Sequence, residues 1–560
     1  MAQQKVRLGD LLLHENILTP EQLESALAHQ KSTGLRLGES IVVLGFITAK
    51  ELLNFISKQL NVPYFSLSNH HFDPELIKLL PEVYARRYHS IVLQKQDTGM
   101  LVGMVDPTDI NAVDEITNAL HMPVNIALVQ QDELNRALDL VYRRTTDITN
   151  YASLLYTEMG GEKAILASSP EQDNAPVVRL VDAIFQDAVQ VNASDIHIEP
   201  DMSVLRIRQR VDGILTENVM NAKSIAPAIT LRLKLMAGLN ISEKRMPQDG
   251  RFSIKVRDKS LDIRLSTLPT QYGESVVMRL LDQSGGILNL EKIGMPSHYL
   301  ERFRKMIRLP RGLVLVTGPT GSGKTTTLYG ALNEINEVGS KIITVEDPVE
   351  YYLPRVNQVQ ISSKIDLTFA KVLRTAMRQD PDIILVGEMR DEETAEIGLR
   401  AALTGHLVLS TIHANDAATS ALRLLDLGVE GYLVASTLRG VLAQRLVRRI
   451  CPFCKEEETL NGQDAAWVAS LNLKNVTSVF YRGKGCGQCN HTGYQGRIGI
   501  FEWLEITPEM GMALEEKNPS KFGVLAREFL GEGLLLHSGM ALVKDGVTTV
   551  DEVQRVAGEI

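Results

Sequence analysis

Three things are scarce in this chain of 560 residues: cysteine, positive charge and long apolar runs. Four cysteines are too few for a disulfide scaffold, and a net charge of -9 argues against a protein that packages nucleic acid. The longest apolar runs, residues 312–318 and 382–387, have the length of a strand and fall far below the ~18 residues that a membrane helix needs. The first residues contain no apolar segment typical of a secretory signal. These absences predict a cytoplasmic protein.

A chain of this length has room for three or four domains. We predict an N-terminal domain over residues 1–145, a polar linker over 146–175, a second domain over 176–284 and an α/β domain over 285–560. In the last domain apolar strands alternate with helices, a pattern that predicts a mostly parallel sheet.

The strongest motif is GPTGSGKT, which follows an apolar strand and opens a helix. Glycines let backbone N–H groups surround a phosphate, and the helix N-terminus adds positive potential. Lys324 is expected to reach the β- and γ-phosphates of a nucleotide, and Thr325 to bind Mg²⁺. The flanking strand and helix argue against a chance match. The predicted phosphate-binding residues are Gly318, Pro319, Thr320, Gly321, Ser322, Gly323, Lys324, Thr325 and Thr326.

Three further polar segments adjoin predicted strands. IITVEDPVEY has Glu346 and Asp347 at its strand end, DIILVGEMRDEETA has Glu388, and GHLVLSTIHANDA is flanked by His406 and His413. Because ligands bind at the carboxyl ends of the strands in an open parallel sheet, we expect the three segments to meet in one crevice. Each segment alone could be a solvated cap or turn, and either histidine could serve a structural hydrogen bond.

GPTGSGKTTT, TVEDPVEY, LVGEMRDEETA and GHLVLSTIHANDA resemble, in order, the Walker A, Asp box, Walker B and His box of the ATPases that drive type II secretion and type IV pilus assembly, the GspE/PilB superfamily. The resemblance implies a RecA-like P-loop ATPase core, a homohexamer that uses ATP and Mg²⁺, and association with an inner-membrane platform protein of a pilus or secretion machine. It also implies that Glu388 is the catalytic glutamate, that Glu346 assists at the metal and the water, and that the partner is no nucleic acid polymer.

The segments ASDIHIEP, LRIRQRVDG, MPQDGRF and DIRLSTLPTQYGESVVMRLL resemble the second N-terminal domain of the same family. This implies a PAS-like α+β domain whose arginines offset the charge of the γ-phosphate. Arg208 and Arg210 are the first candidates for that role, ahead of Arg264 and Arg279. The alternating arginines could instead form a solvated face of a strand.

All four cysteines occur in two C-x₂-C pairs, Cys451 with Cys454 and Cys486 with Cys489. Four thiolates in two such pairs suit tetrahedral Zn²⁺, and without an open ligand position the metal would be structural. We therefore expect a zinc-binding insert over residues 451–489, with buried cysteines or a redox pair as the alternative. Many of the assembly and secretion ATPases that the motor resembles carry such an insert, whereas the retraction ATPases, which resemble them in the motor, generally lack it. This favours assembly over retraction.

The first 59 residues contain a 24-residue motif twice, over residues 7–30 and 36–59, with matched positions 29 residues apart. Its leucines suit the core of a helical hairpin, but its arginine, glycine and glutamine do not contribute to a core. Arginine can stack on a purine and pair with phosphate, glycine admits a close backbone approach, and glutamine both donates and accepts hydrogen bonds. Two such modules suit a ligand with two similar halves.

The paired motif resembles the cyclic-di-GMP-binding N-terminal α+β domain of the MshE-type ATPases of mannose-sensitive haemagglutinin (MSHA) pili. On that resemblance the ligand-binding residues are Arg7, Leu8, Gly9 and Gln30 in one half, Arg36, Leu37, Gly38 and Gln59 in the other, and Asp106 from the domain that follows. One departure concerns the turn, where the second copy has Gly45 and the first has Asn16. Since asparagine tolerates a left-handed backbone better than most residues, we expect weakened rather than lost binding.

The combined prediction is a multidomain α/β ATPase that powers assembly of an MSHA-like type IV pilus under the control of cyclic-di-GMP. It would associate peripherally with the inner membrane through its partners. One alternative is a type II secretion ATPase, and a more distant one is a RecA-like, DNA-dependent ATPase. The zinc insert, the arginine-bearing domain and the acidic charge argue against the second. A scaffold that senses nucleotide without hydrolysis would require Glu388 to be idle.

Overall fold

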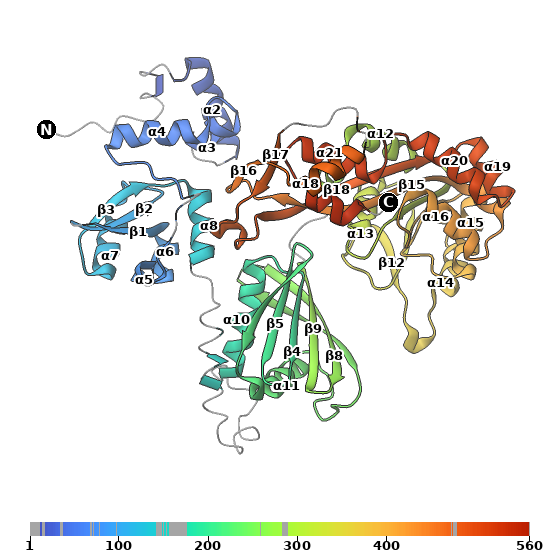
Figure 1. Cartoon of the computed structure of the whole chain (residues 1–560), viewed down its shortest axis with the longest axis horizontal. Coiled ribbons are helices and arrows are strands. Elements are labelled where there is room, and N and C mark those ends of the chain that lie inside the picture. Colours follow the sequence, from blue (N-terminus) through green and yellow to red (C-terminus); the bar gives the residue numbers. More distant parts are fainter. Residues whose placement is uncertain are drawn as a thin grey trace. The chain divides into compact units, whose positions relative to one another are not determined.

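In the computed structural model the chain forms two compact units (Figure 1). The first comprises residues 1–143 with the short segment 485–491, and the second comprises residues 144–484 and 492–560. The structure describes residues 12–13, 17–33, 37–67, 70, 72–77, 79–96, 98–141, 148, 151–152, 154–155, 176–257, 259–282, 289–471, 473 and 479–558. Both units combine helices with strands.

The paired motif at the start of the chain contributes helices α2 (Pro20–Thr33), α3 (Leu37–Val43) and α4 (Ala49–Leu60). The turn before α2 and the turn before α4 have the same hydrogen bond. The N–H of Ile17 donates to the carbonyl of Leu12 at 2.9 Å, and the N–H of Phe46 donates to the carbonyl of Ile41 at 3.2 Å. Both acceptor residues are fully buried. The 29-residue offset of the sequence therefore recurs in the backbone.

The helix that follows each turn also begins with the same cap. The N–H of Thr19 donates to Gln22 Oε1 at 2.9 Å, and the N–H of Gln22 donates back to Thr19 Oγ1 at 3.3 Å. In the second copy Thr48 and Glu51 exchange the same two bonds, at 2.8 and 3.2 Å. This capping box satisfies two backbone donors at a helix start. The duplicated sequence thus folds into duplicated local structure.

The rest of the first unit is a small α+β layer. Its sheet has the order β1–β2–β3, with β1 antiparallel and β3 parallel to β2. The elements are α5 (Pro74–Ile77), α6 (Glu82–Arg87), β1 (Ser90–Gln96), β2 (Gly99–Met104), α7 (Ile110–Leu120), β3 (Val124–Leu128) and α8 (Gln131–Val141). Met100 and Val102 of the central strand share one apolar core with Ile116 of α7 and Leu134 of α8.

The second unit begins with an antiparallel sheet of order β6–β5–β4–β9–β8–β7 and two helices (Figure 1). The elements are α10 (Pro176–Gln190), β4 (Asp195–Pro200), β5 (Leu205–Val211), β6 (Ile214–Met220), η2 (Lys223–Ile225), α11 (Ala226–Met236), β7 (Gln248–Val256), β8 (Lys259–Thr270) and β9 (Gly273–Asp282). Buried residues alternate along β5, as expected for a sheet with one packed face. Ile207 on that face packs with Phe185 of α10 and Ile229 of α11. The arginines of β5 lie on the opposite face.

The remainder of the second unit is built on a sheet of order β12–β11–β13–β14–β10–β15–β18, in which β18 runs antiparallel to β15 and the other pairs are parallel. Its strands are β10 (Gly312–Thr317), β11 (Ile342–Glu346), β12 (Val356–Gln360), β13 (Ile383–Val386), β14 (Leu407–Ile412), β15 (Leu438–Ile450) and β18 (Tyr494–Glu505). Every residue of β10, β11, β13 and β14 is buried, as is typical of parallel strands with both faces covered. The predicted α/β core is confirmed.

Helices and short turns connect these strands. They are η3 (Leu290–Ile293), α12 (Ser297–Met306), α13 (Lys324–Ile335), η4 (Ser363–Ile365), α14 (Phe369–Ala376), α15 (Glu392–Leu403), α16 (Ala417–Asp426), α17 (Gly431–Thr437), α19 (Pro508–Glu515), α20 (Pro519–Leu530), α21 (Leu535–Lys544) and α22 (Val550–Ala557). Between β15 and β18 the chain forms an antiparallel hairpin of β16 (Lys455–Glu458) and β17 (Phe480–Gly483), with α18 (Gly462–Ser470) between its strands and η5 (Gly487–Cys489) after it. Val468 of α18 packs with Val543 of α21 and Val553 of α22.

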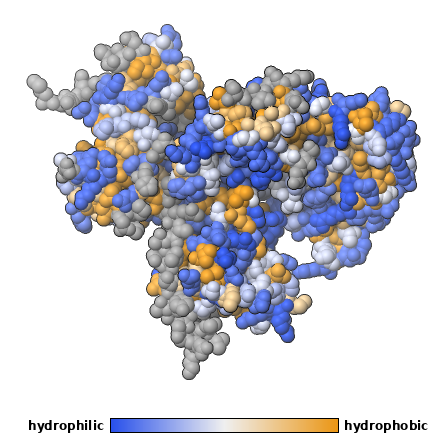
Figure 2. Space-filling model, viewed as in Figure 1, coloured by the Kyte–Doolittle hydropathy of each residue, from blue (hydrophilic) through white to orange (hydrophobic). Residues whose placement is uncertain are grey.

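Within the described residues no helix is both long and apolar enough to cross a bilayer. Figure 2 shows hydrophobic and hydrophilic residues intermixed over the face that it draws.

Candidate active site

The Walker A segment occupies the turn between β10 and α13. Gly318, Gly321 and Gly323 have φ of +142°, +80° and +89°, a region that side-chain-bearing residues rarely adopt. Lys324, the first residue of α13, donates from Nζ to the carbonyls of Gly318 at 2.8 Å and of Pro319 at 3.1 Å. Burial lowers the pKa of the Lys324 ammonium, and the carboxylate of Glu388 acts in the opposite direction. The lysine therefore lies over the loop and feels the charge of Glu388.

Hydrogen bonds join the carboxyl ends of the neighbouring strands. The N–H of Gly387 donates to the carbonyl of Val345 at 2.8 Å, which joins the end of β13 to the end of β11. At the other side of the edge, Oγ1 of Thr317 donates to the carbonyl of Ile412 at 2.9 Å and so joins β10 to β14. The segments that follow these four strands thus emerge along one edge of the sheet, as the sequence predicts.

Glu388 follows β13 at this edge, and only 12% of its side chain is exposed. One carboxylate oxygen pairs with Arg390, and the other lies 3.4 Å from Nε2 of His413. The hydrogen bond that Arg390 donates to Glu388 raises the pKa of Arg390, so the guanidinium stays charged. Glu388 is thus a nearly buried carboxylate at the edge of the sheet, and its charge acts on Lys324 of the Walker A loop. Such a carboxylate can orient a water molecule when one of its two contacts opens.

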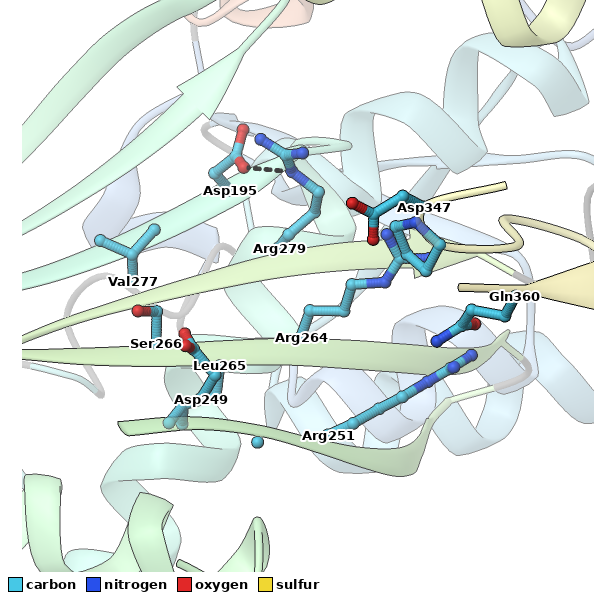
Figure 3. A pocket seen from close by; sticks show the side chains of 12 residues that line it. Asp195, Asp249, Arg251, Arg264, Leu265, Ser266, Val277, Arg279, Asp347 and Gln360 are labelled. Atoms are coloured by element: carbon cyan, nitrogen blue, oxygen red, sulfur yellow. Dashed lines mark hydrogen bonds and ion pairs between the residues drawn. The ribbon is translucent and has the colours of Figure 1, made fainter. Parts of the chain in front are cut away.

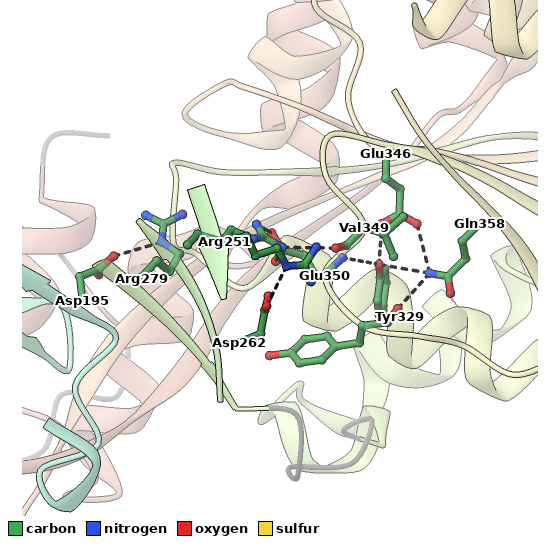
Figure 4. Close-up of polar contacts among 11 residues, drawn as sticks. Asp195, Arg251, Asp262, Arg279, Tyr329, Glu346, Val349, Glu350 and Gln358 are labelled. Atoms are coloured by element: carbon green, nitrogen blue, oxygen red, sulfur yellow. Dashed lines mark hydrogen bonds and ion pairs between the residues drawn. The ribbon is translucent and has the colours of Figure 1, made fainter. Parts of the chain in front are cut away.

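Glu346, the last residue of β11, is 4% exposed and has a different set of partners (Figure 4). It accepts hydrogen bonds from Tyr329 Oη at 2.5 Å, from Thr344 Oγ1 at 2.6 Å and from Gln358 Nε2 at 3.4 Å. Burial, together with the charge of Glu346, raises the pKa of Tyr329, which keeps the phenol protonated as a donor. Both oxygens of Glu346 are thus held by neighbouring side chains. Asp347, the next residue, instead lines a pocket.

The two histidines of the His box lie at opposite ends of β14. His413 follows the strand and lies beside Glu388. His406 precedes the strand, and its Nδ1 lies 2.8 Å from the carbonyl of Ala401, at the end of α15. The structural hydrogen bond that the sequence left open is therefore present at His406.

The arginines of β5 pair within their own sheet. Arg208 pairs with Glu199 at 2.6 Å, and Arg210 lies 3.7 Å from Asp195 and donates to the carbonyl of Gly213 at 3.0 Å. Nothing in these contacts connects either arginine with the loop of the ATPase core. Their predicted role at the γ-phosphate remains a prediction.

Arg264 of β8 does contact the ATPase core. It pairs with Glu350 at 2.7 Å and donates to the carbonyl of Val349 at 3.3 Å, both in the second half of the Asp box (Figure 4). Next to this contact is a pocket of about 630 Å³ (Figure 3), into which Arg264 projects beside Asp347. Its lining residues are Asp195, Asp249, Gly250, Arg251, Arg264, Leu265, Ser266, Val277, Arg279, Asp347, Pro348 and Gln360.

Arg251 of β7 was not predicted as a site residue, yet it lines the same pocket (Figure 3). It pairs with Asp262 at 2.7 Å, whereas Arg279 pairs with Asp195 at 3.0 Å. Arg251 belongs to the segment MPQDGRF, whose only signal was its resemblance to the family. Three arginines, each paired with a carboxylate, thus line one pocket together with Asp347 of the Asp box.

The four cysteines of the insert come together. Their sulfur atoms all lie within 4.8 Å of one another, with Cys451 and Cys489 buried. Sγ of Cys486 lies 3.9 Å from Sγ of Cys489, and tetrahedral Zn²⁺ with bonds of ~2.3 Å would place its sulfurs about 3.8 Å apart. The cluster is therefore compatible with zinc.

The cyclic-di-GMP prediction falls partly on described residues. Gln30 lies in α2, Leu37 and Gly38 begin α3, and Gln59 lies near the end of α4. Asp106 is exposed in the turn before α7 and accepts hydrogen bonds from the N–H and hydroxyl of Thr108, at 3.1 and 2.6 Å. The predicted ligands Arg7, Leu8, Gly9 and Arg36, and the turn residue Asn16, lie outside the described residues. Gly45, which in the second copy corresponds to Asn16, has a φ of +72°.

A family model described as "Type II/IV secretion system protein" matches residues 170–555, which include the sheet, the loop and the cysteine cluster. The chain belongs to this family. A second model, the MshEN domain, matches residues 60–148. The family match begins before the antiparallel sheet and ends within α22, so it covers both parts of the second unit that carry candidate site residues.

Relatives match almost the whole chain. Type IV pilus assembly ATPase PilB of Myxococcus xanthus is 40% identical over 563 residues, which is 98% of each chain. Type II secretion system protein E of Xanthomonas campestris pv. campestris is 38% identical over 562 residues, 99% of this chain and 98% of the relative. The X-ray structure of the Legionella pneumophila ATPase DotB aligns with a TM-score of 0.51 and 21% identity over 68% of this chain and 95% of that one, a likeness of fold.

The protein is therefore an ATPase of the type IV pilus assembly and type II secretion family. Its use of ATP implies Mg²⁺ as well. Of the residues present, Thr325 is the second residue of α13 and is exposed, and an exposed hydroxyl at that position suits a ligand of Mg²⁺ beside bound phosphates.

Proposed function

We propose that the protein is a hexameric motor that hydrolyses ATP to assemble a type IV pilus of the MSHA kind, under the control of cyclic-di-GMP. The observation that carries the proposal is the duplicated motif, followed by an MshEN domain and a complete ATPase core. Full-length similarity to a pilus assembly ATPase supports the pilus assignment. On this proposal the motor acts at an inner-membrane platform protein from the cytoplasmic side.

The chemistry is attack of water on the γ-phosphate. Lys324 and the N–H groups of the loop hold the phosphates, Thr325 would hold Mg²⁺, and bound Mg²⁺ would neutralise charge on the β- and γ-phosphate oxygens. Glu388 orients the water and accepts its proton. Because Arg390 and His413 occupy both of its oxygens, this step requires one of the two contacts to open.

Arginines of the antiparallel sheet offset the charge that develops on the γ-phosphate. Arg208 and Arg210 retain this proposed role, and Arg264 gains support because its guanidinium already reaches Glu350 of the Asp box. For Arg264 to turn to a phosphate, its ion pair with Glu350 must break. The exchange of one anionic partner for another would link ATP binding to movement between the sheet and the core.

We propose Zn²⁺ as the occupant of the cysteine cluster, with Cys451, Cys454, Cys486 and Cys489 as its four ligands. All four positions are filled by protein, so the metal would hold the insert together and take no part in hydrolysis.

The paired motif is proposed to bind one cyclic-di-GMP, with each copy holding one guanine half. The matching turns and caps of the two copies support a quasi-symmetric site, since a ligand with two equal halves suits two similar half-sites. Cyclic-di-GMP bound to this motif, which precedes the MshEN domain in the chain, would regulate ATP turnover.

Calorimetry with cyclic-di-GMP tests this assignment. Arg7→Ala is expected to weaken binding at least about tenfold, because a hydrogen bond to a charged group contributes ~1.5–3 kcal/mol. The matched control is Glu24→Ala, which changes α2 at an exposed position where the two copies differ. Unchanged affinity in Arg7→Ala would remove the site from this motif.

Type II secretion is the alternative, favoured by the relative that matches 99% of this chain. Deletion of the gene from its own bacterium separates the two. Loss of surface pili with normal secretion of enzymes supports pilus assembly, and the opposite result supports secretion.

A further inference from the structure

A buried glutamine on β15, Gln444, contacts the Walker A loop. Gln444 is 2% exposed and belongs to none of the four motifs of the core. Its Nε2 donates to the carbonyl of Ser322 at 2.8 Å, and its Oε1 accepts from Thr327 Oγ1 at 2.6 Å. Both ends of the amide are thus used, one on the loop and one on the first turns of α13. Buried polar groups with both ends satisfied fix the parts that they join.

The backbone of the Walker A loop also lies close to Gln444. A Cβ added at Gly318 would lie 2.3 Å from the carbonyl oxygen of Gln444, and one added at Gly323 would lie 2.8 Å from its Nε2. At Gly318 the close atom belongs to the backbone of the strand, whereas at Gly323 it is the end of the glutamine side chain, which would have to move. The register of β10 with β15 pairs Thr317 with Ala443 and so places Gln444 beside the start of the loop. Gly318 is therefore needed to admit this strand, and Gly323 leaves room for the Gln444 side chain, in addition to the positive φ of both residues.

The bond to Ser322 has a consequence for phosphate binding. In a planar trans peptide the carbonyl of one residue and the N–H of the next point in opposite directions. Because Gln444 holds the Ser322 carbonyl, the N–H of Gly323 points away from Gln444. Loops of this kind bind phosphate through their backbone N–H groups, and a flipped peptide would present a carbonyl oxygen to the anion instead.

We propose that Gln444 is a positioning residue for ATP, which holds the Ser322–Gly323 peptide in the orientation that presents an N–H to the phosphates. Thr327 anchors the glutamine from the other side. The inference rests on the proposed phosphate-binding role of the loop. Since Gln444 touches none of the groups that act on water, its loss weakens nucleotide binding more than it slows the chemical step.

Nucleotide titration and steady-state kinetics of the full-length protein test the proposal. Gln444→Leu keeps the approximate volume but loses both hydrogen bonds, and it is expected to raise the Kd for a fluorescent ATP analogue and the KM for ATP about five- to tenfold, with kcat changed less. Gln209→Leu is the matched control, because Gln209 is also buried on a strand and donates to Asp187 at 2.9 Å, away from the loop. It is expected to lower the melting temperature and leave the Kd within about twofold.

Two further variants keep the test decisive. Thr327→Val removes the anchor alone and is expected to raise the Kd by about two- to fivefold, with no further increase when it is combined with Gln444→Leu, because both act through one contact chain. If Gln444→Leu does not fold, Thr327→Val carries the test. Folded variants with unchanged Kd would overturn the inference.

Lys324→Ala separates this inference from the assignment of the loop. Loss of nucleotide binding in Lys324→Ala with normal binding in Gln444→Leu would refute only the role of Gln444. Normal binding in Lys324→Ala would refute the phosphate-binding role of the loop itself.

Discussion

Two glutamates at the same edge of the central sheet have opposite surroundings. Glu346 ends β11 and Glu388 follows the neighbouring strand β13. Glu388 is paired with two half-exposed side chains, Arg390 and His413. Glu346 is enclosed by the hydroxyls of Tyr329 and Thr344. A carboxylate whose partners are exposed can exchange them for water, whereas a carboxylate whose partners are buried keeps its neighbours in place.

The largest effect is expected when Glu388 loses its charge. Glu388→Gln should lower kcat about 10²–10⁴-fold, the usual contribution of a positioned acid or base, and leave the Kd for ATP within a few-fold. The measurement is phosphate release at saturating ATP together with nucleotide titration. Glu396→Gln is the control, since Glu396 is an ion-paired but exposed carboxylate on the following helix. Turnover that survives in Glu388→Gln would favour a scaffold that senses nucleotide without hydrolysis.

At Glu346 the larger effect is expected on stability. Glu346→Ala leaves the buried hydroxyls of Tyr329 and Thr344 without an acceptor, which should lower the free energy of unfolding by about 2–4 kcal/mol. The drop in kcat should be smaller than in Glu388→Gln. Denaturant unfolding and turnover of the folded fraction give the two numbers.

The double variant Tyr329→Phe with Glu346→Ala sharpens this prediction. Without its hydroxyl, residue 329 no longer needs an acceptor, so the double variant should be more stable than Glu346→Ala alone. A loss of turnover in Glu346→Ala as deep as in Glu388→Gln would instead place Glu346 at the metal and the water, as the sequence predicts.

The contrast between the two glutamates shows where sequence reasoning stops. An apolar strand followed by an acid is visible in the sequence for both residues, and strand direction also places them at one edge. Their partners are not visible, because Tyr329 comes from α13 and Gln358 from β12, and neither belongs to a motif. Only the folded chain shows which acid is enclosed.

Other parts of the site divide in the same way. The two C-x₂-C pairs predict the cysteine cluster because this spacing alone is typical of four thiolates that share one metal ion. Strand direction could have separated His406 from His413, since one precedes β14 and the other follows it. The arginines could not be ranked from sequence. Alternation along a strand identifies a face, but it does not say that Arg264, rather than Arg208, contacts the Asp box.

The smallest effect is expected at Arg390. Its substitution tests whether Arg390 only restrains the Glu388 side chain. Arg390 is 62% exposed, and an exposed ion pair contributes ~0.2–1 kcal/mol. If hydrolysis requires this pair to open, Arg390→Ala should raise kcat by up to about fivefold, with ATP affinity unchanged. Arg400→Ala is the control, because the Arg400 side chain is similarly exposed and pairs with Glu396 on α15, and it should leave kcat unchanged. A tenfold fall in kcat for Arg390→Ala would show that the guanidinium acts on the nucleotide. The surroundings of Glu388 would then be part of the catalytic machinery, and the release of Glu388 from Arg390 would not be a step of the reaction.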